Sequence, residues 1–125
     1  MPARNINLWI GADHREVYRA GDAAGAPVDL TGYDLIFRAL NHLDEQVIRV
    51  PLLIQSAMPS DVQSAVLAKY SALTGCYCLE LPPAQTRLFR VGGQYRYEIE
   101  PRIGGRQLRP WVWGAIVPAG GVNDD

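Results

Sequence analysis

The sequence predicts a mostly-β domain, an antiparallel β-sandwich of short strands with one short helical insertion. Three observations lead to this fold class. Apolar residues alternate with polar residues along most of the chain, which is the two-residue period of a half-buried strand. Turn signals rich in Gly, Pro, Asn and Asp separate these alternating stretches. One stretch, 59–74, departs from the alternation and takes helical spacing instead.

Length and charge narrow the function classes. The chain has 125 residues, 48% of them hydrophobic, which predicts a single domain, 1–125, able to bury its own core. The formal net charge of −1 argues against a nucleic-acid-binding protein, which normally carries a basic patch. The arginines at 102, 106 and 109 are interleaved with Glu98 and Glu100, which indicates a mixed-charge surface.

The expected cellular setting follows from two further features. No apolar run approaches the roughly 20 residues that cross a bilayer, and residues 1–5 lack the apolar core of a signal peptide. We therefore expect a protein made and retained in a cytoplasm. Cys76 and Cys78 are two residues apart on a predicted strand, where a disulfide would be strained and a metal would lack partners. We expect them to be small side chains packed under a neighbouring strand.

The first half of the chain predicts strands at 6–10, at 17–18, at 33–39 and at 48–54. Tyr33, Leu35, Phe37 and Ala39 share one face of the third of these strands. Pro51 cannot donate to a ladder, which indicates an edge strand or a bulge.

Stretch 59–74 carries the helical signal. The apolar residues at helical spacing are Val62, Val66, Tyr70 and Leu73. Ser60 or Asp61 is a suitable cap for the helix start, and Gly75 stands where a left-handed residue ends a helix. The alternative is a strand at 65–70, because Ser, Val and Tyr are mediocre helix formers.

Strand signal returns at 76–81, where Tyr77, Leu79 and Leu81 share the apolar face. Prolines end this strand, and 83–89 is compatible with one short helical turn. Gly104-Gly105 is a two-residue hairpin signal, because both glycines tolerate positive φ. The last residues, 119–125, are expected to form a flexible tail.

The hairpin fixes a predicted register. If Ile103 pairs with Arg106, the pairs that follow are Glu100–Arg109, Glu98–Trp111, Tyr97–Val112 and Arg96–Trp113. The core face then carries Tyr95, Tyr97, Ile99, Leu108, Val112 and Ile116. The opposite face carries Arg96, Glu98, Glu100, Arg102, Arg109, Trp111 and Trp113.

Two interpretations of the aromatic residues on that charged face stay open. Trp and Arg are enriched at interface hot spots, which favours a contact patch. The predicted interface residues are Trp111, Trp113, Arg96, Glu98, Arg109 and Trp9. Alternatively, the indoles are lids covered by arginine and glutamate stems, with an Arg96–Trp113 stack worth about 0.5–1 kcal/mol.

No catalytic, cofactor-binding or metal-ligating residue is predicted. His14 lies in the run Asp13-His14-Arg15-Glu16, which offers a carboxylate–histidine pair, but a catalytic dyad also needs a nucleophile or metal held in a pocket, and adjacent strand residues point to opposite faces. His42 lies in a polar turn and is expected to be solvated. The acidic end, Asn123-Asp124-Asp125, is interpreted as part of the tail and not as a calcium loop.

The order of these motifs carries a family resemblance. It runs from Ile6-x-Leu8-x-x-Gly11-x-Asp13, through Gly25-x-Pro27-Val28-Asp29-Leu30-Thr31-Gly32-Tyr33, to Gly75-x-Tyr77-x-Leu79-x-Leu81. It continues through Pro83-x-x-Thr86-x-Leu88 and Gly93-x-Tyr95-x-Tyr97 to Gly114-x-Ile116. The sequence resembles the small immunoglobulin-like structural proteins of tailed phages and prophages, including domains similar to the N-terminal region of the upper baseplate protein. It departs from their pattern at 56–72, an apparent insertion.

The resemblance implies an immunoglobulin-like sandwich and a non-enzymatic virion structural protein, an assembly or docking module of the tail or baseplate. It implies other virion proteins as partners, in multiple copies, with no cofactor, nucleic acid or membrane. The expected location is the virion, after synthesis in the host cytoplasm without secretion. A capsid decoration or head–tail joining protein is one alternative, and a host-surface carbohydrate-binding domain is another.

Overall fold

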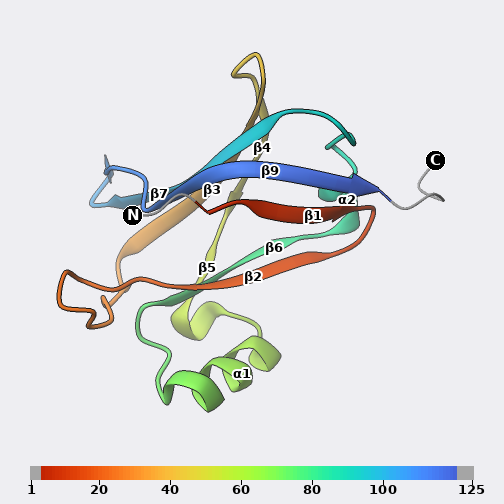
Figure 1. Cartoon of the computed structure of the whole chain (residues 1–125). Helices are drawn as coiled ribbons and strands as arrows, with labels where there is room; N and C mark the ends of the chain where they lie inside the picture. Colours follow the sequence, from red (N-terminus) through yellow and green to blue (C-terminus); the bar gives the residue numbers. More distant parts are fainter. Residues whose placement is uncertain (1–3, 121–125) are drawn as a thin grey trace.

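The computed structural model describes residues 4–120, which fold into two β-sheets packed face to face (Figure 1). The large sheet holds β1 (Ile6–Ile10), β9 (Val112–Gly120), β7 (Tyr95–Ile103), β3 (Tyr33–Asn41) and β4 (Gln46–Pro51), in that order, and β8 (Arg106–Gln107) pairs with β7. The small sheet holds β2 (His14–Arg19), β6 (Cys76–Leu81) and β5 (Leu53–Ile54). The helical segments are η1 (Gln55–Ala57), α1 (Ser60–Tyr70) and α2 (Pro83–Thr86).

The prediction of a mostly-β sandwich with a helical insertion is confirmed. The strand order is that of an immunoglobulin sandwich: β2, β6 and β5 take the places of strands B, E and D. Strands β9, β7 and β3 take the places of G, F and C, and β4 adds the further strand of the variable type. One pair is not antiparallel, because β1 runs parallel to β9.

The core lies between the two sheets. The largest fully buried apolar side chains there are Tyr77, Tyr97, Phe37, Phe89, Ile6, Leu8, Leu30, Leu35, Leu79, Leu81 and Ile99. Most of them come from alternate residues of the strands, as the two-residue period predicts, while Leu30 and Phe89 lie in loops. Aromatic pairs join neighbouring strands within each sheet, with Phe37 and Tyr97 5.4 Å apart and Tyr18 and Tyr77 5.2 Å apart between ring centroids.

The strand predicted at 48–54 is divided between the sheets. β4 ends at Pro51 in the large sheet, and the chain then crosses at Leu52 to β5 in the small sheet. The Leu52 N–H still donates to the Leu35 carbonyl, at 2.8 Å, before the crossing. The edge position inferred from Pro51 is confirmed, since β4 is the last strand of the large sheet.

The helical interpretation of 59–74 is confirmed by α1, and the alternative strand at 65–70 is wrong. The details of its ends differ from prediction. Pro59 occupies the N-cap position and no side chain caps the helix, while Ser71 takes the left-handed conformation at its end, with φ 65°. Gly75 is also left-handed, with φ 82°, but it belongs to the turn that enters β6.

Helix α1 covers the outer face of the small sheet (Figure 1). Val62 and Val66 pack with Met58 against Cys76 and Cys78, all of them buried. The cysteines are free thiols, and the prediction that a neighbouring strand covers them is wrong, because the covering element is this helix.

The turn before β3 explains the Pro-Val-Asp-Leu-Thr-Gly run. The Asp29 carboxylate accepts hydrogen bonds from the N–H and the hydroxyl of Thr31, at 3.0 and 2.8 Å. The Tyr33 N–H then donates to the Leu30 carbonyl across Gly32, whose φ of 87° a β-carbon would disfavour. The two hydrogen bonds from Thr31 also hold the pKa of Asp29 below its ordinary value.

Two polar side chains fix the loops at opposite ends of the sandwich. Gln55 accepts the N–H groups of Leu30 and Gly75, at 2.8 and 3.2 Å. Thr86, fully buried at the end of α2, accepts the Gly11 N–H at 3.1 Å and lies 2.9 Å from the Ala12 carbonyl, to which it donates. The short helical turn predicted in 83–89 is confirmed by α2.

The Gly-Gly hairpin is confirmed at its tip, where Ile103 pairs with Arg106. Beyond Gln107 the predicted register is wrong by two residues, because Trp113 lies opposite Glu98 and Val112 opposite Ile99. The pairs Glu100–Arg109, Glu98–Trp111, Tyr97–Val112 and Arg96–Trp113 therefore do not form. Segment 108–111 contains Pro110, which has no N–H, and leaves the ladder; its Leu108 and Trp111 N–H groups reach the Pro101 and Ile99 carbonyls.

The predicted tail, 119–125, lies mostly outside the described residues. Residues 119 and 120 belong to β9, where Gly120 pairs with Ile10, so the tail prediction is wrong for these two. Residues 121–125 are not described. None of the helices within residues 4–120 combines the length and the apolar character needed to cross a membrane.

Candidate functional site

The outer face of the large sheet carries an exposed apolar strip. Its members are Trp9, Trp113, Ala115 and Val117, which β1 and β9 present on the side away from the core. Trp9 is 55% exposed, Trp113 41% and Val117 47%. Ile6, Leu8, Val112 and Ile116 alternate with them and are buried, so the strip is the second face of two well-anchored strands.

A charged row continues from the strip across the same face. In register across the sheet, Trp113 lies opposite Glu98, Glu98 opposite Arg38, and Arg38 opposite Arg49. The Arg38 guanidinium is 2.8 Å from the Glu100 carboxylate and 3.8 Å from that of Glu98. The row thus carries charges of both signs, one glutamate followed by two arginines, next to an apolar strip.

Glu100 is the unusual member of this face. Its side chain is 1% exposed, although it lies on the sheet face opposite the core. One carboxylate oxygen meets Arg38, while Oε2 makes no hydrogen bond in the described structure and lies 3.8 Å from Arg102. The prediction that Glu100 contributes to an exposed charged surface is wrong, because Arg38 covers it and Ile36, its neighbour on β3, is itself only 8% exposed.

The sequence holds a signal for this partial burial. Ile36 and Leu40 share the outer face of β3 with Asp34 and Arg38, and both are buried. Apolar residues on both faces of a strand indicate cover on both sides. Attention to that pattern would have identified the outer face of β3 as half-covered.

The predicted interface residues do not all meet on one face. Trp111 lies at the margin of the core, with ring centroids 5.3 Å from Tyr33 and 6.5 Å from Tyr77. Its placement on the outer face is wrong, because the residues that leave the ladder at 108–111 turn its side chain inward. Arg109, in the same segment, is exposed and lines a shallow depression with Trp111 and Trp113.

Arg96 has a different partner from the one predicted. Its guanidinium is 2.9 Å from the Asp44 carboxylate in the β3–β4 turn, and its neighbour on β9 is Ala115. The predicted Arg96–Trp113 stack therefore does not form across the strands. Of the predicted interface residues, Trp9, Trp113, Glu98 and Arg96 share the outer face.

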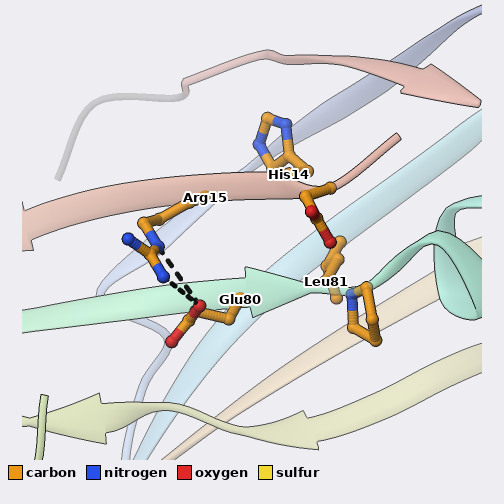
Figure 2. A pocket seen from close by; sticks show the side chains of 6 residues that line it. His14, Arg15, Glu80 and Leu81 are labelled. Carbon is orange, nitrogen blue, oxygen red and sulfur yellow. Dashed lines mark hydrogen bonds and ion pairs between the residues drawn. The ribbon is translucent and has the colours of Figure 1, made fainter. Parts of the chain in front are cut away.

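The shallow pocket around His14 is the other candidate site. Figure 2 shows His14 and Arg15 pointing away from each other, as expected for adjacent strand residues. Arg15 pairs across the strands with Glu80, at 2.7 Å, and reaches Asp61 on α1 at the same distance. These contacts tie α1 to the small sheet and raise the pKa of Arg15.

On the inner side of β2, His14, Glu16 and Tyr18 form a hydrogen-bonded chain. Glu16 is 3.0 Å from the His14 ring and accepts the Tyr18 hydroxyl at 3.0 Å. Burial alone would raise the pKa of Glu16, but these two hydrogen bonds outweigh it, and the pKa lies below its ordinary value. Burial raises the pKa of Tyr18. Each carboxylate oxygen of Glu16 thus already has a partner within the chain.

Within residues 4–120, no three His, Cys, Asp or Glu side chains lie close enough together to hold a metal ion. His42 borders a shallow depression with Tyr95 and Gln94, beside the β3–β4 turn.

Comparison with known proteins adds no family. No protein-family model matches this sequence, and no curated protein matches it significantly.

Proposed function

We propose that this protein is a non-enzymatic structural component of a phage or prophage virion, which docks to another virion protein in the tail or baseplate. Two features support the proposal. One is the motif order, from Pro27-Val28-Asp29 to Gly114-x-Ile116, by which the sequence resembles small immunoglobulin-like phage proteins. The other, which carries the proposal, is the exposed Trp9–Trp113 strip beside the charged row.

The strip has the chemistry of a protein contact. Trp and Arg dominate interface hot spots because they combine large apolar area with directed polar groups. Trp113 on β9 supplies the first and Arg38 on β3 the second, on either side of Glu98 on β7. Both stand on ladder strands, so docking immobilises few side chains and loses little conformational entropy.

The mixed charge of the face indicates a protein partner with its own charge pattern. Arg38, Arg49 and Arg96 lie on this face together with Glu98, and Asp44 lies beside Arg96 in the β3–β4 turn. A mixed pattern fixes the orientation of a complementary protein surface more than it adds raw affinity. Repeated copies in a particle add avidity, so individual contacts need not be tight.

The host-surface carbohydrate alternative is not favoured by the aromatic residues. Tyr97 is buried, and the half-buried Tyr95 packs against the core, with its ring 4.9 Å from that of Phe89 between centroids. The exposed rings of the large sheet are Trp9 and Trp113, and Trp113 borders only a shallow depression with Arg109 and Trp111.

The test is binding of the purified protein to particles of the phage or prophage whose genome encodes it. Trp113→Ala is expected to weaken co-sedimentation with particles by at least about tenfold, or about 1.4 kcal/mol. Leu67→Ala is the matched control: Leu67 is 45% exposed on α1, on the far side of the sandwich. Equal loss in both variants would contradict docking through the outer face.

Gold labelling in electron micrographs locates the bound protein. Label at the tail or baseplate supports the proposal, whereas label over the capsid or at the neck supports decoration or head–tail joining instead. A purified protein that binds no particle at all, under conditions where it is folded, would refute the virion function.

A further inference from the structure

Apart from the two-residue strand β8, the described sheets have four open edges, and three of them are protected against pairing. A bare edge is a template for another strand, and proteins block it with proline, charge or shortness. β5 is only two residues long. β2 carries Arg15, Glu16 and Arg19. β4 carries Pro51. The Leu52 N–H points to Leu35 of β3, and because the backbone direction alternates along a strand, the Pro51 nitrogen points to the open side.

β1 is the fourth edge, and it has none of these protections. Its five residues, Ile-Asn-Leu-Trp-Ile, include no charge and no proline. Asn7 and Trp9 are exposed, and Trp9 adds a large apolar side chain beside the edge. An uncharged edge with an exposed aromatic residue is the pattern that promotes strand addition.

The backbone groups that face outward from β1 can be identified. The Arg4 N–H donates to the Trp113 carbonyl at 2.8 Å. The backbone N–H and C=O groups of the even-numbered residues in this segment therefore point toward β9. Because the backbone direction alternates along a strand, the N–H and C=O groups of Asn5, Asn7 and Trp9 face away from β9. Outside the β1–β9 ladder, no hydrogen bond within residues 4–120 uses the Asn7 backbone.

We propose that β1 pairs antiparallel with β1 of a second copy of this chain, about a two-fold axis at Asn7. In this register Asn7 faces the other Asn7, and Asn5 of each copy faces Trp9 of the other. All three are hydrogen-bonded pairs of an antiparallel ladder, in which the two residues exchange two N–H···O=C bonds. Every outward-facing backbone N–H and C=O group of Asn5, Asn7 and Trp9 is then used. The Trp9 carbonyl already accepts the Ala12 N–H at 3.2 Å and keeps a second lone pair.

The next register along the strand is disfavoured. It would place Asn5 opposite Gly11, but the Gly11 N–H already donates to the Thr86 hydroxyl at 3.1 Å. The free edge therefore ends at Trp9, and the Asn7-centred register is the one that matches every free donor with a free acceptor.

A second copy fits this edge because the strand is complementary to itself. A two-fold axis sets each residue against its own kind, which would penalise a charged strand, and β1 carries no charge. Trp9 would lie over the Asn5 side chain of the second copy, which places the two apolar strips next to each other. The two-fold contact is closed, so it gives a dimer and not a fibre.

This inference goes beyond the proposed function, since it requires no phage partner. A monomer that binds particles would refute the pairing alone. A dimer that binds no particles would refute the virion function alone.

The experiment measures the oligomeric state of the full chain by sedimentation equilibrium over a range of concentrations. The wild type is expected to dimerise. Asn7→Lys and Asn7→Glu each place like charges on the axis, so each is expected to raise the dimer dissociation constant at least about tenfold. An equimolar mixture of the two is expected to restore dimerisation as a heterodimer, because Lys then faces Glu.

The matched controls are Gln46→Lys and Gln46→Glu on the opposite edge, which replace an exposed amide in β4 and are expected to leave dimerisation unchanged. Hydrogen exchange gives a second measurement, since the Asn7 amide is expected to be protected at high protein concentration and to exchange rapidly at low concentration. A wild type that is monomeric at all concentrations, an Asn7→Lys variant that dimerises normally, or a mixture that stays monomeric would overturn the proposal.

Discussion

Replacement of Arg38 by methionine tests how the outer face of the large sheet is held together. The Glu100 side chain is 1% exposed, and Arg38 provides its shortest charge contact, at 2.8 Å. Met keeps much of the apolar stem of Arg38 and removes the charge. The remaining cation, Arg102, is 3.8 Å from a carboxylate oxygen that has no hydrogen bond.

The expected magnitude follows from the burial of the pair. Breaking a buried ion pair by removing one partner costs about 3–5 kcal/mol, because the other charge is left buried without compensation. The Arg38 side chain is 30% exposed, so water reaches the site and the lower end applies. We expect Arg38→Met to lower the free energy of unfolding by about 3 kcal/mol.

The double variant separates the pair from general packing loss. Arg38→Met with Glu100→Leu replaces the whole pair by apolar groups, a change that is often neutral or stabilising. We expect the double variant to lose only about 1 kcal/mol, so Glu100→Leu is expected to recover about 2 kcal/mol of the stability that Arg38→Met loses.

Urea denaturation provides the assay, followed by tryptophan fluorescence and far-ultraviolet circular dichroism so that two-state unfolding is checked. With a slope of about 1–3 kcal/mol/M, the Arg38→Met midpoint is expected to fall by about 1–3 M. If the double variant is as unstable as Arg38→Met, the buried charge is not the cause. If Arg38→Met lowers the free energy of unfolding by less than about 1 kcal/mol, the Arg38–Glu100 pair does not stabilise the outer face of the large sheet.

Three further predictions concern the interior. Thr86→Val removes the hydroxyl that accepts the Gly11 N–H, and it is expected to lower the free energy of unfolding, measured in urea, by about 2 kcal/mol. Thr86→Ser keeps the hydroxyl and is expected to cost less. A larger loss in Thr86→Ser than in Thr86→Val would contradict this role. Burial raises the pKa of Cys76 and raises that of Cys78 to about 11, so the folded protein is expected to react slowly with a thiol reagent at pH 8 and rapidly in urea; fast reaction when folded would refute it. Because the folded-state pKa of Glu16 is lowered, its stabilisation is complete above its unfolded pKa of about 4.5 and is lost as pH falls through the folded pKa. Unfolding free energies measured from pH 7 to pH 3 are therefore expected to fall less steeply for Glu16→Gln, and equal slopes would count against this role.

The sequence predicted which residues of β7 and β9 face the core, even though the pairing between them was wrong. The true register is displaced by two residues, and two is the side-chain period of a strand. Tyr97 and Val112 therefore stay inside, and Glu98 and Trp113 stay outside. The size of the displacement was not predictable, because it depends on which N–H groups of 108–111 form hydrogen bonds with carbonyls of β7.

Trp111 shows the limit of the alternation argument. The alternation holds only while the chain stays in the ladder, and Trp111 is the last residue before β9 begins. Its side chain turns inward to Tyr33 and Tyr77, which come from strands of different sheets. That contact is a product of the tertiary fold, and no local pattern encodes it.

The burial of Cys76 and Cys78 was predicted, but the covering element was not. The run from Cys76 to Leu81 has apolar residues on both faces for four positions, which is typical of a strand covered on both sides. The helix at 59–74 was predicted separately. Joining the two observations would have placed α1 over β6, since a helix with buried Val62 and Val66 needs an apolar surface.

The two outer faces of the sandwich are therefore unequal, and this inequality limits where a partner can bind. Helix α1 occupies the outer face of the small sheet and is tied there by the Arg15–Asp61 contact. Among residues 4–120, no helix covers β1 and β9 of the large sheet in this way, and its exposed tryptophans stand on strands whose other faces are buried. A partner at the small sheet would meet a helix surface with few large apolar groups, whereas a partner at the large sheet gains the Trp113 ring and the edge of β1 together. Because the two gains are adjacent, pairing through β1 would widen the surface around Trp113 without covering it.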